Sequence, residues 1–135
     1  YRGGLVVGDP ALIALIREVR KHAGMIVPTP IQRAMSVALA DENHVQEQAQ
    51  RYAARRSVLL PALKSAGFKV EFSDAGLYIW CTRDESDWDS IAWLAERGIL
   101  ATPGHFYGSA GNRHIRIALT STDADIADAA QRIAE

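Results

Sequence analysis

The sequence predicts a small α+β unit preceded by the trailing edge of another domain. After about residue 66, short stretches rich in branched and aromatic residues alternate with helical stretches, which indicates a small mixed or antiparallel sheet covered by helices. The front of the chain has one short apolar stretch and one helical stretch, too little to bury a core. We therefore expect residues 1–27 to be the trailing strand and helix of a large domain, residues 28–66 to be connecting helices, and residues 67–135 to be a small C-terminal α+β domain.

The composition excludes several classes of function. The chain has 135 residues, 48% of them hydrophobic, with a formal net charge of -1 and no block of like charge, so we expect neither a nucleic-acid partner nor a membrane partner. Its one cysteine, Cys81, cannot form an internal disulfide and fits a reducing, cytoplasmic location. The first residue is Tyr1 and not Met, so we expect the sequence to be a fragment or an incomplete protein.

The first part of the chain predicts a strand and a helix. Residues 4–8 place three apolar residues between glycines, which favours a short buried strand. Asp9 is expected to cap the following helix, with Pro10 at its first position. Gly24 then suits the end of that helix.

Two further helices follow. Thr29 and Gln32 have the spacing of a capping box, which predicts a helix over residues 30–40. A long third helix is expected from about Glu42 to Ala66. Its charged side chains are expected to form one solvated face: Glu47, Arg51, Arg55 and Arg56.

The C-terminal part predicts a sheet and two helices. Residues 68–72 alternate, with Phe68, Val70 and Phe72 expected to point inward, and residues 77–82 predict a second strand that pairs with them. The following elements are expected to be a helix over residues 87–97, a short strand over residues 99–102, a glycine-containing loop over residues 103–108 and a last helix capped at residues 122–123.

Arg116 stands out in the strand expected over residues 114–119. It is flanked by Ile115 and Ile117, and a guanidinium is costly to desolvate unless an anion meets it. Its planar fork matches a carboxylate or a phosphate with two parallel hydrogen bonds. Arg116 therefore either holds a substrate carboxylate or belongs to a solvent face that it shares with His114 and Ala118.

Other candidate residues carry weaker signals. Arg2 lies beside two glycines, which would let an anion approach both the backbone and the guanidinium, although an ordinary surface arginine has the same pattern. The histidines at positions 22, 44, 105 and 114 lack the spacing of a metal site, so we expect no bound metal. Cys81 lies in a predicted strand and is expected to be a core residue.

Four segments in register resemble the class I/II aminotransferases, which are fold type I enzymes that use pyridoxal 5'-phosphate (PLP). The segments are residues 1–10, residues 75–80, residues 98–108 and residues 112–120. The third segment departs from the family pattern at Tyr107, which is inserted in the aromatic slot. The resemblance implies an α/β, PLP-dependent transferase-like fold. It also implies that Arg2 contacts the cofactor phosphate and that Arg116 binds the substrate α-carboxylate.

The resemblance also implies that an essential residue lies outside this sequence. The Schiff-base lysine would precede Tyr1, and Lys21, Lys64 and Lys69 stand elsewhere, so we expect no catalytic residue in this chain. The family acts on small-molecule amino acids and 2-oxo acids, commonly as a homodimer. We expect Arg2 and Arg116 to converge on one cavity.

Within the family, the sequence is most similar to the actinobacterial N-succinyldiaminopimelate aminotransferases, through residues 20–25, 75–78 and 93–100. That similarity implies amino transfer from glutamate to N-succinyl-2-amino-6-oxopimelate in lysine biosynthesis. Two alternatives stay open. One is a class I aminotransferase with a different acceptor, and the other is the non-catalytic aminotransferase-like domain of a transcription regulator.

Overall fold

The chain folds into two compact units, Tyr1–Val45 and Gln46–Glu135. The structure is a computed structural model, and it describes residues 2–135. The division of the sequence at residues 27 and 66 stays a prediction.

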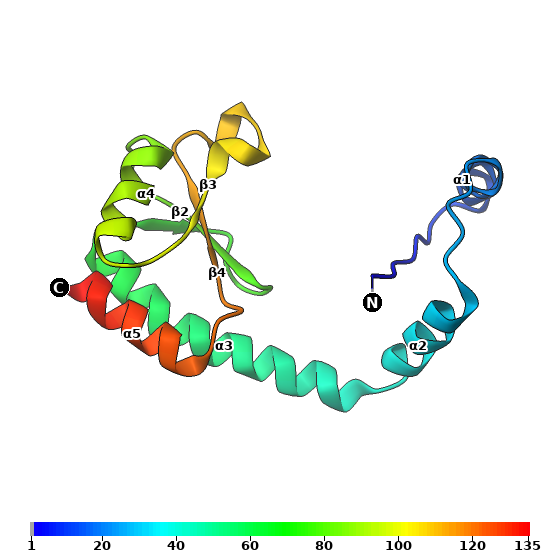
Figure 1. Cartoon of the computed structure of the whole chain (residues 1–135), viewed down its shortest axis with the longest axis horizontal. Helices are drawn as coiled ribbons and strands as arrows, with labels where there is room; N and C mark the ends of the chain where they lie inside the picture. Colours follow the sequence, from blue (N-terminus) through cyan, green and yellow to red (C-terminus); the bar gives the residue numbers. More distant parts are fainter. Residues whose placement is uncertain (1) are drawn as a thin grey trace. The chain divides into compact units, whose positions relative to one another are not determined.

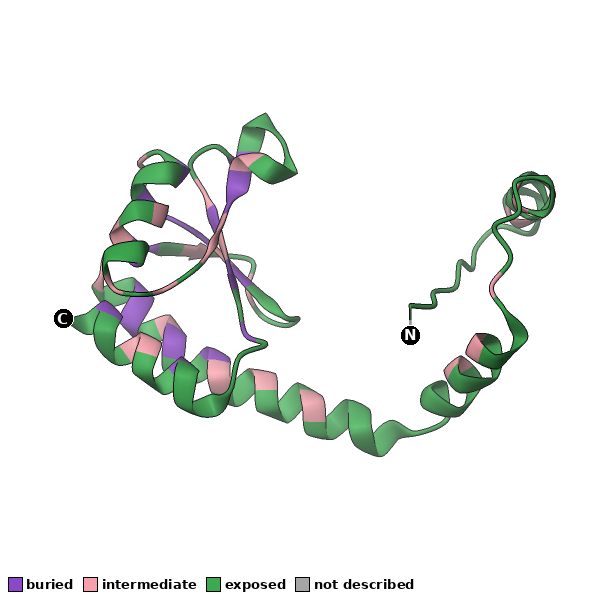
Figure 2. Ribbon diagram, viewed as in Figure 1, coloured by how far each residue is buried: buried purple, intermediate pink, exposed green. Residues whose placement is uncertain are grey.

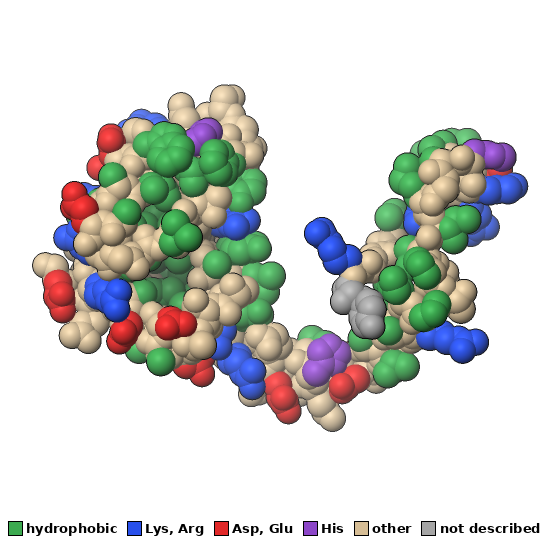
Figure 3. All heavy atoms as spheres, viewed as in Figure 1, with side chains coloured by type: hydrophobic (Ala, Val, Ile, Leu, Met, Phe, Trp, Pro, Cys, Tyr) green, Lys and Arg blue, Asp and Glu red, His purple; other side chains and the backbone are tan. Residues whose placement is uncertain are grey.

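The first unit holds two helices, α1 (Pro10–His22) and α2 (Thr29–Leu39), and neither contains a buried residue (Figure 2). α1 begins as expected, because the Asp9 side chain accepts hydrogen bonds from the backbone N–H groups of Ala11 (2.9 Å) and Leu12 (3.1 Å). Figure 3 shows hydrophobic side chains gathered on the surface of this unit. The exposed ones include Leu5, Val6, Val7, Leu12, Leu15, Ile16, Val19, Met25, Ile26, Val37 and Leu39.

Two expectations for this unit are wrong. Residues 4–8 do not form a strand, because a strand needs a hydrogen-bonded neighbour and these residues have none within the described chain. The capping box is also absent. Pro28 occupies the N-cap position of α2 without a side-chain bond, Thr29 is already helical, and the Gln32 side chain donates to the carbonyl of Val27 (2.7 Å).

The second unit contains a four-stranded sheet, and every strand pair in it is antiparallel (Figure 1). Its strand order is β1-β2-β4-β3. In chain order the elements are α3 (Glu42–Ser65), whose first four residues belong to the first unit, β1 (Lys69–Glu71), β2 (Tyr78–Thr82), α4 (Asp87–Glu96), β3 (Thr102–Pro103), the short 3₁₀ helices η1 (Gly104–Tyr107) and η2 (Ser109–Gly111), β4 (Ile115–Ala118) and α5 (Asp123–Ala134). The expected hairpin is present as the β1–β2 pair.

Three helices cover one face of the sheet and leave the other face to polar and aromatic side chains. The buried core joins α3, α4 and α5 to the central strands. Its members include Leu59, Leu63, Ile79, Cys81, Leu94, Ile115, Ile117, Ile126 and Ile133. Because side chains alternate along a strand, Tyr78, Trp80 and Arg116 lie on the opposite face.

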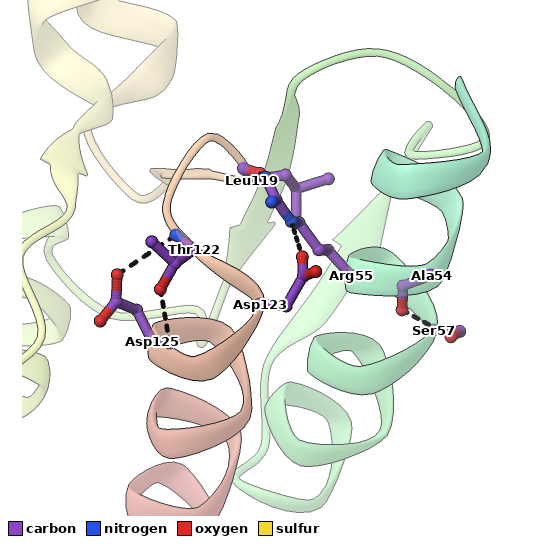
Figure 4. A network of polar contacts seen from close by, with 7 residues as sticks. All are labelled: Ala54, Arg55, Ser57, Leu119, Thr122, Asp123 and Asp125. Carbon is purple, nitrogen blue, oxygen red and sulfur yellow. Dashed lines mark hydrogen bonds and ion pairs between the residues drawn. The ribbon is translucent and has the colours of Figure 1, made fainter. Parts of the chain in front are cut away.

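Arg55 and Arg56 of α3 donate hydrogen bonds to other segments of this unit. The expectation that these two residues belong to a solvated face is therefore wrong. Arg55 reaches across to α5, where it donates to Asp123 Oδ1 (2.6 Å) and to the carbonyl of Leu119 (2.9 Å; Figure 4). Arg56 is buried and donates to the carbonyl of Gly76 (2.6 Å). Long side chains can bury their stems while the guanidinium satisfies backbone carbonyls, which a helical periodicity does not reveal.

Two details of the expected sheet also differ. Phe72 is 99% exposed and has a φ of 48°, so the chain leaves the strand before Phe72 can join the core. The strand expected over residues 99–102 shortens to Thr102–Pro103, and Leu100 is 96% exposed. Across the part of the chain that the structure describes, no helix combines the length and the apolar character needed to cross a bilayer.

Candidate functional site

Arg116 lies at the centre of β4, on the face of the sheet that the helices do not cover. Its neighbours Ile115 and Ile117 are buried on the helix side, while Arg116 is half-buried. In the register of the sheet it stands between Trp80 of β2 and Thr102 of β3. The predicted alternation of this strand is therefore confirmed.

Aromatic rings, and not carboxylates, surround the Arg116 guanidinium. The guanidinium carbon lies 4.1 Å from the ring centre of Tyr78 and 5.2 Å from that of Tyr107. One terminal nitrogen donates to Thr102 Oγ1 over a long 3.4 Å, and the buried Nε has no hydrogen-bond partner. No Asp or Glu among residues 2–135 lies within 4.0 Å of the guanidinium nitrogens. A half-buried cation with aromatic neighbours and vacant donors is suited to an incoming anion.

The rest of this face forms a row of stacked rings. Trp80 meets Tyr107 edge-on at 5.9 Å between ring centres and stacks on His114 at 5.2 Å. His114 Nε2 lies 3.3 Å from Glu71 Oε2, so the row ends in an acid on β1. Tyr107, at the other end of the row, contacts both the guanidinium of Arg116 and the ring of Trp80, and so links Arg116 to the row.

Backbone contacts fix the loop that carries Tyr107. Gly104 donates to the carbonyl of His114 (2.8 Å), and a Cβ added at Gly104 would lie less than 3.0 Å from the backbone carbonyl oxygens of Gly111 and His114. Only glycine allows this close approach, which explains why the turn is glycine-rich. The turn is consequently held against the start of β4.

A buried carboxylate holds the same loop from the other side. Asp87, at the first position of α4, is 3% exposed. It accepts hydrogen bonds from the backbone N–H (3.0 Å) and the ring Nδ1 (2.6 Å) of His105, and its other oxygen accepts from the N–H of Trp88 (3.0 Å). Burial acts to raise the pKa of Asp87, but the bonds from His105 and Trp88 outweigh it and hold the pKa below its usual range.

Arg2 lies in the first unit, exposed, at an open hollow of about 640 Å³. Gly3, Gly4 and a second cation, Arg20, also line this hollow. Two guanidinium groups beside small residues fit the charge of a phosphate group. The convergence of Arg2 and Arg116 on one cavity stays a prediction.

The sequence did not single out Tyr78 as part of the site, and it treated Tyr107 only as a residue in an aromatic slot. The signal for Tyr78 was present, because it is two residues from Trp80 and therefore shares its face of the strand. Contact with Arg116 also requires the β2–β4 pairing, which single-strand alternation does not specify.

Cys81 is buried in the core as expected, and burial raises the pKa of its thiol to about 12.

The fold of this chain and the placement of its two arginines indicate a class of protein. A small domain with an antiparallel sheet presents one arginine, and a glycine-flanked arginine precedes α1, as the resemblance to PLP-dependent aminotransferases implies. A solved structure of an aminotransferase from Neisseria meningitidis superposes with a TM-score of 0.81 at 31% identity, over 96% of this chain and 35% of that one. The predicted PLP-dependent transferase-like fold is confirmed.

The chain belongs to the aminotransferase class I and II family, because the sequence model of that family matches residues 1–133. It is 58% identical to the "Probable aminotransferase Rv1178" of Mycobacterium tuberculosis, over 98% of this chain and 32% of the relative. It is 54% identical to the "4-dedimethylamino-4-oxo-anhydrotetracycline transaminase OxyQ" of Streptomyces rimosus, over 98% of this chain and 37% of the relative. An "LL-diaminopimelate aminotransferase" of Nitratidesulfovibrio vulgaris is 30% identical, over 100% of this chain and 36% of the relative. The chain thus spans about a third of the length of these relatives.

Proposed function

We propose that this chain is the C-terminal part of a PLP-dependent aminotransferase, in which Arg116 binds the α-carboxylate of the amino acid and of the 2-oxo acid. The observation that carries the proposal is the surroundings of the Arg116 guanidinium. Its positive charge has no carboxylate partner within the described residues, its Nε is buried without a partner, and two aromatic rings flank it. Such a cation is stabilised when a substrate carboxylate binds.

In this proposal Arg2 binds the phosphate group of the cofactor. It is exposed beside two glycines, and Arg20 lines the same hollow, so the cofactor phosphate would meet two cations there. The Schiff-base lysine is proposed to lie upstream of Tyr1. When bound, PLP supplies an electron sink for the carbon that bears the amino group.

The contribution of this chain to the reaction is positioning. Arg116 would fix the carboxylate with two parallel hydrogen bonds, which restricts rotation of the substrate and orients the bond that must break. Because the same carboxylate occurs in the amino acid and in the 2-oxo acid, one arginine serves both halves of the reaction. The proposal includes a homodimer in the cytoplasm, as the family resemblance implies.

The finer proposal concerns the substrate. We propose a succinyldiaminopimelate transaminase, which transfers the amino group of glutamate to N-succinyl-2-amino-6-oxopimelate in lysine biosynthesis. The similarity of residues 20–25, 75–78 and 93–100 to that group supports it, and so does the similarity to an enzyme named LL-diaminopimelate aminotransferase. A different acceptor is the second candidate, because a 54% identical relative is named for a tetracycline precursor.

The experiment compares variants of the full-length protein loaded with PLP. Arg116→Ala removes two charge-assisted hydrogen bonds, about 3 kcal/mol of transition-state binding, so kcat/KM for glutamate should fall about 100-fold. Arg51→Ala, which removes an exposed arginine of α3, is the matched control and should leave kcat/KM unchanged. An unchanged kcat/KM for Arg116→Ala would remove Arg116 from the site.

The acceptor is tested separately. Steady-state rates with the succinylated and the unsuccinylated 2-amino-6-oxopimelate should differ by at least tenfold in favour of the succinylated compound, which is about 1.4 kcal/mol of discrimination. Equal rates, or a preference for an aromatic 2-oxo acid, would reject the finer proposal and leave the aminotransferase assignment in place.

A further inference from the structure

Tyr78 and Tyr107 reach the Arg116 guanidinium from two different elements. Tyr78 projects from β2 and is 41% exposed, and Tyr107 projects from η1 and is 55% exposed. The guanidinium carbon lies over both rings, at 4.1 Å and 5.2 Å from their centres. Both distances are within the range in which a cation is attracted to the face of an aromatic ring.

We propose that Tyr78 and Tyr107 are positioning residues that hold the Arg116 guanidinium ready for a carboxylate without neutralising it. This inference rests on the proposed function, because it takes Arg116 as the carboxylate-binding group. The rings are the positioning element, and the tyrosine hydroxyl groups are not needed for it.

The chemistry of the two kinds of neighbour explains why aromatic rings suit this task. An acidic residue beside Arg116 would orient it as well, but it would occupy the N–H donors and cancel the charge that the substrate must meet. A ring contacts the flat face of the guanidinium and leaves the N–H donors in its plane available. Thr102 takes only one donor, over a long 3.4 Å, so most of the fork stays vacant.

Tyr107 is itself held in place. Its ring packs edge-on against Trp80 at 5.9 Å, and its loop is tied to Asp87 through His105. The position of the guanidinium therefore depends on packing between β2, β4 and η1, and not on the flexible arginine side chain alone. Pre-organisation of this kind reduces the ordering that substrate binding requires.

The test uses the full-length, PLP-loaded protein and butyrate, a carboxylate that has no amino or oxo group and so cannot react. Its competitive inhibition constant against glutamate reports carboxylate binding alone. Tyr78→Leu should raise this constant and the KM for glutamate about two- to fivefold, with kcat changed less than twofold. The double variant Tyr78→Leu with Tyr107→Leu should raise both about tenfold.

Three further variants separate the explanations. Tyr78→Phe keeps the ring and should behave as the natural protein, and Phe72→Leu removes a 99% exposed aromatic residue outside the site and should have no effect. Tyr107→Leu alone changes a 55% exposed residue of η1, and it should raise the butyrate inhibition constant and the KM for glutamate in the same direction as Tyr78→Leu.

Each outcome decides between the claims. If Arg116→Ala weakens butyrate binding but neither Tyr78→Leu nor Tyr107→Leu does, this inference fails and the proposed function stands. If Arg116→Ala leaves butyrate binding unchanged, the proposed function fails and takes this inference with it. If Tyr78→Phe is as weak as Tyr78→Leu, the hydroxyl group and not the ring holds the guanidinium, which also overturns the inference.

Discussion

The Asp87→Asn variant should destabilise the second unit and loosen the loop that carries Tyr107. In the natural protein Oδ2 of Asp87 accepts two hydrogen bonds from His105, at 3.0 Å from the backbone nitrogen and 2.6 Å from Nδ1. Asparagine can keep the bond from the N–H of Trp88 but turns an NH₂ group toward His105, where it opposes the backbone N–H and meets an acceptor at Nδ1 only if the imidazole changes tautomer. Two hydrogen bonds to a charged, buried group are lost as a result.

The expected magnitude follows from these two bonds. A hydrogen bond to a charged group contributes about 1.5 to 3 kcal/mol, so the free energy of unfolding should fall by about 3 kcal/mol at pH 7. Asp89→Asn is the matched control, since Asp89 is an exposed acid in the first turn of the same helix. Its loss affects mainly the helix dipole and should lower the free energy of unfolding by less than about 1 kcal/mol.

The pH dependence gives a second test of the same contact. Because the folded-state pKa of Asp87 lies below the ordinary value of 3.8, its contribution is fully present above that value and is lost as the pH falls through the folded-state pKa. The difference in the free energy of unfolding between the natural protein and Asp87→Asn should therefore shrink in strong acid. The Asp89→Asn variant should follow the natural protein closely across the same range.

Urea unfolding of the 135-residue chain, followed by tryptophan fluorescence, is the assay, because Trp80, Trp88 and Trp93 are its three tryptophans and all lie in the second unit. The signal therefore reports this unit directly. A free energy of unfolding for Asp87→Asn within about 0.5 kcal/mol of the natural protein would refute the role assigned to the Asp87–His105 contact. The same conclusion would follow if the two proteins differed equally at every pH.

Three other variants or treatments probe single features of the second unit. Gly104→Ala places a Cβ less than 3.0 Å from two backbone oxygens and should lower the melting temperature by more than about 8 °C, as measured by circular dichroism. Thr122→Ala removes the acceptor for the N–H of Asp125 and should reduce the free energy of unfolding by about 1 kcal/mol in urea titrations; no change would mean that the cap is redundant. The Cys81 thiol, whose pKa burial raises to about 12, should resist iodoacetamide in the folded protein at pH 8 and react in urea, and rapid labelling without urea would contradict its burial.

Local patterns predicted the second unit well where each element is decided by its own residues. The alternation around Arg116 and the cap at Thr122 are visible in the sequence and are present in the structure. The strand expected over residues 4–8 failed for a different reason. Apolar residues between glycines are compatible with a strand, but no described segment supplies the hydrogen-bonded neighbour that a strand needs.

The candidate site was only partly predictable, because it depends on contacts between distant segments. Arg116 stood out in its own strand because apolar residues flank it, but the strand alone left a solvent-face arginine open, and the family resemblance selected the carboxylate-binding role. The rings that hold it come from β2 and η1, and their contacts follow from the strand register and from the close approach of Gly104 to Gly111. The amino-acid sequence of this chain alone does not specify either feature.

The most direct measurement is a crystal structure of the full-length protein with PLP and a bound amino acid or unreactive analogue. We predict that the α-carboxylate lies on the Arg116 guanidinium with two N–O distances of about 2.7 to 2.9 Å, and that the cofactor phosphate contacts Arg2. A carboxylate bound by other residues, with the Arg116 guanidinium facing solvent, would contradict the role proposed for Arg116.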